Sequence, residues 1–291
     1  MTTFLSTAAG VLLLVVALND VFHTLLRPAS TGRLTTLVFR TVWGMSRGRR
    51  PLAVSGPLTV LATISVWIVL VTLGWALVYL PHFPDGFSYS GVNPADYNPF
   101  LEVITFSLVA LTTLGLGDVV PAEPIIRFLS PLEALTGFAL LSASVSWYMQ
   151  LYPALARRRA VAIELTSLHE SGIRMTPPAV SAGYAASVVS SVARSLAELT
   201  ADLVQNTEIF YFAERDDRLS VTRAIGYAID VRDAARASGD GDLRAAGVLL
   251  EKVLDELARV LTEQYPHVTG ESTDAILRAV AGSHGHQLGS S

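Results

Sequence analysis

The stretch Thr113-Leu114-Gly115-Leu116-Gly117-Asp118 decides how the rest of this 291-residue chain is interpreted. It places two glycines two residues apart among apolar side chains, and it ends on a carboxylate. Glycine reaches backbone conformations with positive φ without the steric cost that a Cβ atom imposes. The stretch therefore predicts an irregular and tightly shaped loop, which by itself could be a simple glycine turn between two helices.

Hydrophobic segments frame this loop on both sides. The one before it, Leu58 to Leu80, contains no charged residue. The one after it, about Ile125 to Tyr152, contains Arg127 and Glu133. About 20 apolar residues suffice for a helix to cross a bilayer, so both are predicted to span a membrane. Pro99 to Thr112 is too short to span, and it predicts a re-entrant helix because irregular backbone at membrane depth must line a cavity.

A further hydrophobic segment runs from about Phe4 to Leu26. It has no positively charged start and no small-residue cleavage site, so we expect a retained span and no cleaved signal peptide. Only 16% of the residues are charged, against about 25% in soluble proteins. The charges concentrate in residues 157–291, which hold fourteen of the 21 basic and eighteen of the 25 acidic side chains. The expected fold class is an all-α membrane protein with a soluble helical domain.

In these surroundings the loop resembles the selectivity filter of potassium channels. Residues 57–152 resemble the pore module of that family, which consists of an outer helix, a pore helix, the filter and an inner helix. In that family four copies of the loop turn their backbone carbonyls toward a common axis, where they replace the water shell of K⁺. Because this chain has one such loop, the resemblance implies a homotetramer embedded in a lipid bilayer.

The resemblance assigns a role to each residue of the loop. Four backbone carbonyls, with the Thr113 hydroxyl, would form the K⁺ sites: those of Thr113, Leu114, Gly115 and Leu116. Gly117 would let the chain turn toward the external mouth, where Asp118 would place a carboxylate. Thr112 would face a water-filled cavity at the C-terminal end of the pore helix, whose dipole favours a cation there.

The loop departs from the family's pattern in the side chains that support it. Leu116 stands where a tyrosine is common, and Thr105 and Phe106 stand where the family often has two tryptophans. Side-chain hydrogen bonds that hold the family's filter are therefore missing, and Val109 cannot pair with Asp118 either. We expect packing of three side chains to hold the filter instead: Phe106, Leu108 and Leu116. Such a filter would be more prone to collapse or to admit Na⁺.

Arginine sets the expected orientation, because cytoplasmic loops carry an excess of basic residues. The loop after the first span contains six arginines and no acidic residue: Arg27, Arg33, Arg40, Arg47, Arg49 and Arg50. Arg157 to Arg159 follow the last span, whereas residues 81–98 contain two aspartates and neither Lys nor Arg. We therefore expect a plasma-membrane protein with its N-terminus outside and its C-terminal domain in the cytoplasm.

An amphipathic helix is expected within residues 28–56, on the inner surface of the membrane. Its apolar face comprises Leu34, Leu37, Val38, Thr41, Val42 and Met45. Arginines recur every seven residues on another face. The helix could be a cuff that couples to a gate, or a basic linker that only anchors the protein.

Charged residues inside predicted spans are costly and usually paired, so they are candidate modulators. Asp20, His23 and Arg27 share one stripe of the first span. They could form an ion-paired strip, or a pH-sensitive contact, because histidine titrates near neutral pH. Glu133 is expected behind the filter, bound to Thr105 or to the backbone of the pore helix. It could be a structural clamp or a titratable modulator.

Three positions of the last span are candidates for the hinge and the gate. Gly137 lies twenty residues after Gly117, where many family members have a hinge glycine. Glycine weakens a helix by about 1 kcal/mol relative to alanine, which localises bending. It could equally permit close packing between helices. Met149 and Tyr152 are candidates for the inner constriction.

The C-terminal domain is predicted to be helical. Helices are expected from Pro177-Pro178 to about Gln205, over about Leu219–Ala237, and from Asp242 as N-cap to Gln264. The apolar positions of the last helix are spaced as in a coiled coil: Ala246, Leu250, Val253, Leu257 and Val260. This stripe could be an intersubunit coil or, as we prefer, the core of a local bundle. No nucleotide-binding signature is present.

The sequence thus divides into four parts: 1–27, an extra N-terminal span; 28–56, the interfacial segment; 57–152, the pore module; and 153–291, the helical domain. Passive conduction of K⁺ is the predicted function, with K⁺ as the permeant ion and no organic cofactor. The chain has no catalytic constellation, which predicts no enzymatic activity, and its net charge of −4 gives no reason to expect nucleic-acid binding. The alternatives are a non-selective cation channel and a non-conducting receptor that anchors the helical domain, whose cytoplasmic ligand or partner the sequence does not identify.

Overall fold

The structure, a computed structural model, describes residues 2–25, 32–46, 55–172, 179–212, 214, 216–265, 268 and 270–283. The chain divides into two compact units. The first comprises residues 1–38 and 60–149, and the second comprises residues 39–59 and 150–291. Helices make up nearly all of the described secondary structure, so the predicted all-α class is confirmed.

Three described helices are long and apolar enough to cross a membrane. They are α1 (Thr2–Leu25), α3 (Ser55–Tyr79) and α5 (Pro124–Glu170). Their hydrophobic lengths match the three spans predicted from the sequence, and the chain is a multi-pass membrane protein. α5 continues as one unbroken helix past residue 152, where the sequence places the end of the pore module.

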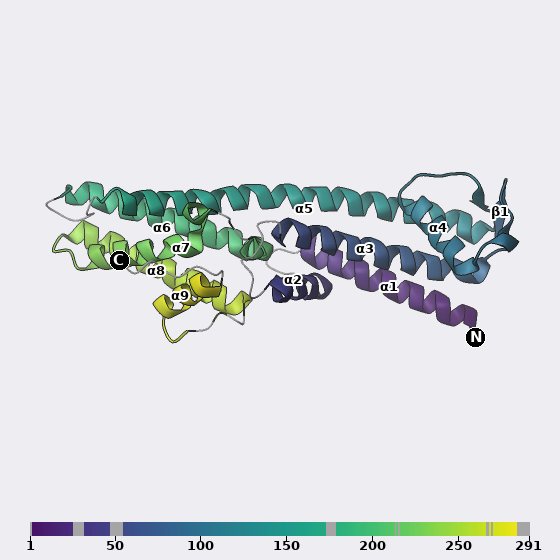
Figure 1. The fold of residues 1–291 in the computed structure, drawn as a ribbon, viewed down its shortest axis with the longest axis horizontal. Helices are drawn as coiled ribbons and strands as arrows, with labels where there is room; N and C mark the ends of the chain where they lie inside the picture. Colours follow the sequence, from purple (N-terminus) through teal and green to yellow (C-terminus); the bar gives the residue numbers. More distant parts are fainter. Residues whose placement is uncertain are drawn as a thin grey trace. The chain divides into compact units, whose positions relative to one another are not determined.

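In the first unit α1 lies beside α3 (Figure 1). A Cβ atom built on Gly10 would come within 2.5 Å of the Gly74 carbonyl oxygen, and one on Gly74 within 2.8 Å of the Leu14 side chain. Glycines at these positions therefore let the two helix backbones approach closely, as small residues do in membrane helices. The core beside this contact includes Trp75, Tyr79, Val103, Phe106 and Ile126.

The short helix α4 (Pro99–Leu111) lies in the sequence between α3 and α5. Two short 3₁₀ helices precede it, η1 (Leu80–His82) and η2 (Pro94–Asp96). Two three-residue strands, β1 (Phe87–Tyr89) and β2 (Val119–Pro121), pair antiparallel, with Ser88 opposite Val120. This small sheet joins the segment before α4 to the segment that leaves the glycine loop.

The helix α2 (Arg33–Ser46) forms where an amphipathic helix is expected. Among residues 33–42 of this helix the buried positions are Thr35 and Phe39, whereas Leu37 is 64% exposed. Exposure of Leu37 is compatible with a face turned toward lipid, so the predicted apolar face stays a prediction, and Phe39 is a further, buried apolar position of this helix. In the second unit the Phe39 ring packs 5.2 Å from the Tyr211 ring, a contact that the helical periodicity alone did not indicate.

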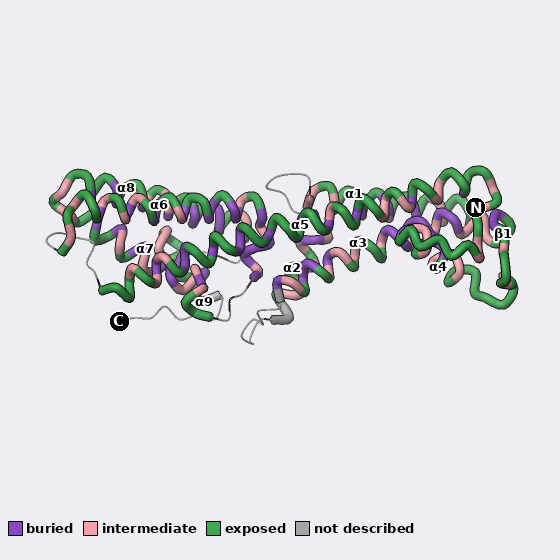
Figure 2. The backbone as a smooth tube through the Cα atoms, turned by 90° about the horizontal axis from the view of Figure 1, so that it is seen from above, coloured by how far each residue is buried: buried purple, intermediate pink, exposed green. Residues whose placement is uncertain are grey.

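The second unit contains α6 (Ala182–Gln205), α7 (Val221–Arg236), α8 (Gly241–Gln264) and α9 (Thr273–Ser283), with η3 (Thr207–Tyr211) and η4 (Asp217–Leu219). Buried residues recur along α6 and α8, which pack on each other (Figure 2). Four residues of the α8 stripe are buried in this bundle: Ala246, Leu250, Leu257 and Val260. The structure supports the local-core interpretation of that stripe over an intersubunit coil.

The ends of these helices differ from the predicted ends. α6 begins at Ala182 with Ser181 as N-cap, and Pro177-Pro178 lie outside the described residues. The N-cap of α8 is Asp240, not Asp242, because the Asp240 carboxylate accepts from the backbone N–H groups of Asp242 and Leu243. Aspartate is a favoured N-cap at either position. Asp240 is the N-cap here because the chain turns into the helix directly after it.

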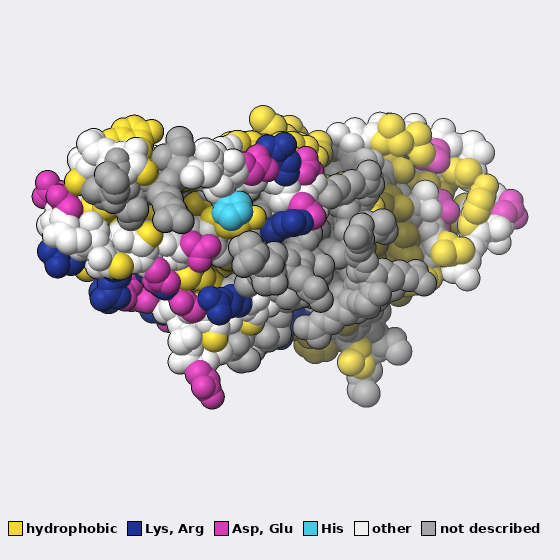
Figure 3. Space-filling model, turned by 60° about the vertical axis from the view of Figure 1, so that its left-hand side comes forward, with side chains coloured by type: hydrophobic (Ala, Val, Ile, Leu, Met, Phe, Trp, Pro, Cys, Tyr) yellow, Lys and Arg dark blue, Asp and Glu magenta, His cyan; other side chains and the backbone are white. Residues whose placement is uncertain are grey.

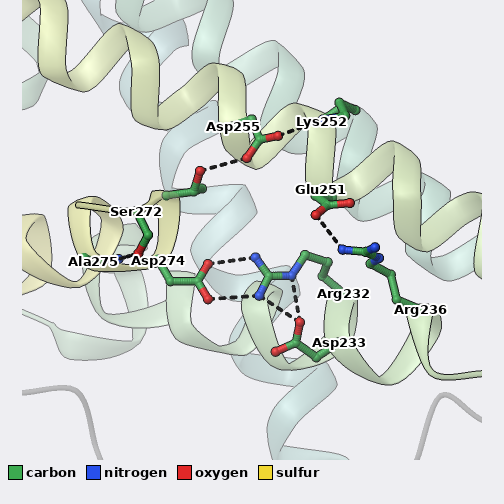
Figure 4. Close-up of polar contacts among 10 residues, drawn as sticks. Arg232, Asp233, Arg236, Glu251, Lys252, Asp255, Ser272, Asp274 and Ala275 are labelled. Atoms are coloured by element: carbon green, nitrogen blue, oxygen red, sulfur yellow. Dashed lines mark hydrogen bonds and ion pairs between the residues drawn. The ribbon is translucent and has the colours of Figure 1, made fainter. Parts of the chain in front are cut away.

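The surface of the helical unit carries both signs of charge. Figure 3 shows acidic and basic side chains interspersed, with small hydrophobic areas between them. Figure 4 shows one group of these charged side chains, in which Arg232 of α7 donates to both oxygens of Asp274 in α9 at 2.7 and 3.0 Å. Arg236 pairs with Glu251 of α8 at 2.5 Å in the same region.

Candidate functional site

The short helix α4, which stands where the pore helix is expected, starts and ends on side chains suited to those positions. The Asn98 side chain accepts from the backbone N–H groups of Phe100 and Leu101, and Pro99 occupies the first position. Asparagine is among the best N-caps, and proline is favoured directly after it. At the other end the N–H of Thr112 donates to Leu108 O at 3.0 Å, and its hydroxyl donates to the same oxygen at 2.7 Å. Thr112 therefore closes the helix just before the loop.

The glycine loop alternates its backbone conformation residue by residue. φ is 59° at Thr113, 58° at Gly115 and 82° at Gly117, and Leu114 and Leu116 are not in the positive range. Two N–H groups tie the start of the loop to the pore helix, Thr113 N to Ala110 O and Leu114 N to Val109 O, each at 3.0 Å. The left-handed conformation costs a non-glycine residue about 1–2 kcal/mol, so Thr113 carries local strain.

The loop is open along its length in the single chain. Residues 112–117 are all exposed, including 64% of Leu114 and 59% of Leu116. Beyond the glycine itself and its two chain neighbours, no atom of the described residues lies within 4 Å of the position that a Cβ would take at Gly115 or Gly117. Nothing in the described part of this chain therefore supports the loop from the side on which these residues are exposed.

Asp118 is bound into the outer sheet. Its carboxylate accepts from the N–H of Val119 at 2.9 Å, and its backbone oxygen accepts from Ser90 N at 2.8 Å. The β1–β2 pairing continues from this point. Nearby, burial and the negative charges of Glu102 and Asp85 raise the pKa of Tyr89 to about 12. The mouth of the loop is thus an acidic region held by backbone hydrogen bonds.

Of the side chains predicted to support the loop by packing, only some pack within the single chain. Phe106 is buried, with its ring 5.3 Å from the Tyr79 ring and 4.9 Å from the Phe87 ring. Leu108 and Leu116 are 41% and 59% exposed. Of the three side chains expected to hold the filter, Phe106 therefore packs within the chain, and the other two present open apolar surface.

Glu133 lies behind the pore helix, but its partner differs from the predicted ones. The Thr105 hydroxyl donates to Leu101 O within its own helix at 3.0 Å. Ser107 approaches Glu133 instead, with its Oγ 2.5 Å from Oε1, and both residues are 0% exposed. The sequence reasoning missed Ser107, for which the available signal was a hydroxyl on the otherwise apolar inner face of α4.

Gly137 serves close packing. A Cβ atom there would collide with the carbonyl oxygen of Leu111, the last residue of α4. α5 runs through this position without a break. The contact fits the packing role that the sequence left open, and a hinge at Gly137 stays a prediction.

The proposed inner constriction is open in the single chain. Met149 is 65% exposed and Tyr152 is 54% exposed, on successive turns of α5. A constriction at these residues would need further copies of the chain, so their role stays a prediction.

Asp20 has uncharged partners. Its buried carboxylate accepts from Leu34 N at 2.8 Å, Thr35 N at 3.1 Å, Thr35 Oγ1 at 2.8 Å and Trp67 Nε1 at 2.9 Å. His23 is half-buried with its ring 5.9 Å from that of Phe22, and Arg27 lies outside the described residues. Asp20 thus joins α1 to α2 and α3 through hydrogen bonds, and the sequence did not indicate Thr35 or Trp67.

No group of three or more His, Cys, Asp or Glu side chains suited to a metal ion occurs in the described ranges. The K⁺ sites proposed from the resemblance would consist of backbone oxygens and a hydroxyl. Such sites do not require a carboxylate cluster.

The family comparison covers the region of the chain that contains the glycine loop. Residues 62–152 match the family model described as "Ion channel". The chain is 26% identical over 170 residues to the "Uncharacterized membrane protein YdjJ" of Bacillus subtilis (strain 168). The matched region covers 56% of this chain and 49% of the relative. The chain thus spans about half the length of that relative. No solved structure matches the chain. The predicted resemblance to a channel pore module is confirmed for the matched residues.

Proposed function

From the match of residues 62–152 to the ion-channel family model, we propose that this protein conducts K⁺ passively and selectively through a pore formed by four identical chains. The proposed selectivity filter is Thr113 to Gly117. Conduction through a channel of this kind involves no covalent chemistry, in keeping with a family that points to a non-enzyme.

The alternating backbone of the loop is the observation that carries the proposal. Left-handed conformations at Thr113, Gly115 and Gly117 alternate with ordinary ones at Leu114 and Leu116. Alternation of this kind turns successive carbonyl oxygens toward the same side of a strand. A row of such oxygens can replace the hydration shell of K⁺. The glycines adopt these conformations freely, and only Thr113 adopts one at a cost.

The open surface of the loop supports an oligomer. A loop exposed from residue 112 to residue 117 would be unsupported in a single chain. Exposed apolar side chains beside it, Leu114, Leu116 and Leu108, offer surface for neighbouring copies. One loop per chain then requires four chains around the axis, as in the family that the sequence resembles.

The C-terminal end of α4 favours a cation in the cavity on the inner side of the proposed filter. The C-terminal end of a helix carries a partial negative charge. Thr112 stands at this end, and its backbone N–H and hydroxyl both turn back to Leu108 O. A hydrated K⁺ in the central cavity of the tetramer would be stabilised by the four helix ends.

Two other functions stay in competition. A non-selective cation channel is favoured by Leu116, which cannot make the hydrogen bond of the tyrosine common in the family. A non-conducting receptor is favoured by the separate helical bundle in residues 150–291. We place that bundle in the cytoplasm, the N-terminus outside and the loop facing outward, in a plasma membrane, from the distribution of arginine.

The decisive experiment measures K⁺ and Na⁺ flux from liposomes that contain the purified full-length protein. Gly115→Asp introduces a side chain where φ is 58° and should abolish K⁺ flux. Gly91→Asp is the matched control, because Gly91 also has positive φ, at 77°, and also has no atom within 4 Å of a Cβ position. It lies outside the loop, so its flux should resemble that of the unmodified protein.

Each outcome distinguishes the candidates. K⁺ flux that exceeds Na⁺ flux and disappears only in Gly115→Asp would support the selective channel. Equal fluxes of both ions would favour the non-selective channel. Absence of flux from well-folded tetramers would favour the receptor, and cross-linking would test whether four chains assemble.

A further inference from the structure

Ser107 of the pore helix stands between acceptors on two other helices. Its Oγ atom is 3.1 Å from the backbone oxygen of Thr72 in α3 and 2.5 Å from Oε1 of Glu133 in α5. Ser107 and Glu133 are both 0% exposed. These contacts join α3, α4 and α5 at one buried point.

The hydrogens available at this point are few. A serine hydroxyl has one hydrogen and can donate it once, whereas a backbone carbonyl can only accept. Thr72 O therefore bonds to Ser107 only if the hydroxyl hydrogen points toward Thr72. The contact between Ser107 and Glu133 is then a hydrogen bond only if the carboxyl group carries a proton. One arrangement satisfies both contacts: Glu133 donates to Ser107, and Ser107 donates to Thr72.

The surroundings of Glu133 favour the same protonated form. The titratable group that faces it is Tyr79 of α3, and no Lys, Arg or His among the described residues pairs with it. The other polar group that acts on the Glu133 carboxyl is the Tyr79 hydroxyl, a phenol and not a cation. A buried carboxylate without a cation is far more costly than a buried neutral acid. The protonated acid is therefore the form that this interior accommodates.

We propose that Glu133 is held as a neutral carboxylic acid and positions the pore helix by donating a hydrogen bond through Ser107 to Thr72. Ser107 lies one turn before Leu111, where α4 ends and the filter loop begins. The Ser107 contact fixes that turn of α4 against α3 and α5. Glu133 is a positioning residue, since it touches Ser107 and not the proposed path of the ion. Its effect on selectivity rests on the proposed function.

The protonation state has a test that does not depend on conduction. Infrared difference spectra between the full-length protein and Glu133→Gln, both in lipid at neutral pH, should contain the C=O stretching band of a buried protonated carboxyl group. Glu208→Gln is the control, because burial raises the pKa of Glu208 to about 7 and this acid could contribute a similar band. The band must persist in Glu208→Gln. Its absence from the unmodified protein would overturn the proposal.

Rescue by a conservative variant tests the positioning role. Glu133→Gln keeps an N–H that can donate to Ser107, so its ratio of K⁺ to Na⁺ permeability should stay near that of the unmodified protein. Glu133→Leu keeps the volume and removes the donor, and its ratio should fall about tenfold, the size of effect expected for one buried hydrogen bond. Ser107→Ala should cause a similar fall, and the double variant Ser107→Ala with Glu133→Leu should be no worse than either alone.

The two tests separate the failures. Equal permeability ratios in Glu133→Gln and Glu133→Leu would overturn the positioning role even where the infrared band is present. If the unmodified protein conducts no ion at all, the proposed function fails. In that case the infrared band still decides the protonation state, and the thermal midpoints of the two Glu133 variants decide whether the donor supports the helix packing.

Discussion

Gly137 of α5 packs directly against the carbonyl group of Leu111, the last residue of the pore helix α4. A Cβ atom at position 137 would occupy the space of that oxygen, so the two backbones approach as closely as glycine permits. The helix that follows the glycine loop in sequence, α5, therefore also contacts the end of the helix that precedes the loop, α4. The contact lies at Leu111, directly before the glycine loop. A small displacement of this end of α4 would therefore also move the loop.

Replacement of Gly137 by alanine should displace the end of the pore helix. Overpacking of a rigid contact typically costs about 1–3 kcal/mol, and here the obstacle is backbone that cannot rotate away. We expect Gly137→Ala to lower the thermal midpoint of the purified protein and to reduce K⁺ flux in liposomes. Gly183→Ala is the control, because no atom lies within 4 Å of a Cβ there. A Gly137→Ala protein with unchanged midpoint and flux would contradict the close-packing role.

Features that depend on a short stretch of sequence could be predicted, whereas contacts between distant residues could not. The three long apolar helices and the short apolar helix between two of them follow from local properties, namely apolar length and a glycine loop between two apolar segments. Ser107 and Glu133 are 26 residues apart, and Asp20 and Trp67 are 47 apart. Such pairs depend on how helices pack, which no local pattern encodes. The choice of Asp240 over Asp242 as N-cap likewise depends on where the chain turns, since both residue types suit the position.

Glu208 should make the stability of the helical unit depend on pH. It lies in η3 and is 5% exposed. After burial, its negative charge is a further cause that raises the pKa of Tyr211 and of Tyr265. Burial raises its pKa from 4.5 to about 7. The folded protein therefore binds this proton more tightly than the unfolded chain. The stabilisation is complete below pH 4.5 and is lost as the pH rises through about 7.

The size of this effect can be measured with one variant. A shift of that extent corresponds to about 3 kcal/mol, so the thermal midpoint of the full-length protein should fall between pH 5 and pH 8. Glu208→Gln cannot ionise and should flatten the decrease, and at pH 8 it should melt above the unmodified protein. Parallel curves for the two proteins would show that another group causes the pH dependence.

Asp20 should be essential to the junction of α1 with α2 and α3. Its carboxylate receives hydrogen bonds from Leu34, Thr35 and Trp67. Asp20→Ala would leave several donors unpaired, and each buried unpaired group costs about 1–3 kcal/mol. We expect a large fall in thermal midpoint and faster hydrogen exchange in residues 33–38. Trp67→Phe removes one donor only and should cost less. Equal losses in the two variants would contradict the multiple-acceptor role.

Arg232 and Asp274 should contribute more to stability than the exposed ion pairs of the same unit. The guanidinium donates to both carboxylate oxygens, at 2.7 and 3.0 Å, and the Arg232 side chain is 10% exposed (Figure 4). Hydrogen bonds to charged groups in such settings contribute about 1.5–3 kcal/mol. The Arg232 guanidinium holds the pKa of Asp274 below its usual range. This contribution is present at neutral pH and is lost as the pH falls through the lowered pKa.

Asp274→Asn should therefore lower the thermal midpoint at neutral pH and have less effect in acid. Glu263→Gln is the matched control, because it removes one carboxylate from the exposed pair with Arg259 on α8. Exposed pairs contribute about 0–1 kcal/mol, so this variant should melt close to the unmodified protein. A loss in Glu263→Gln as large as that in Asp274→Asn would mean that the bidentate bridge between α7 and α9 adds nothing beyond ordinary surface charge.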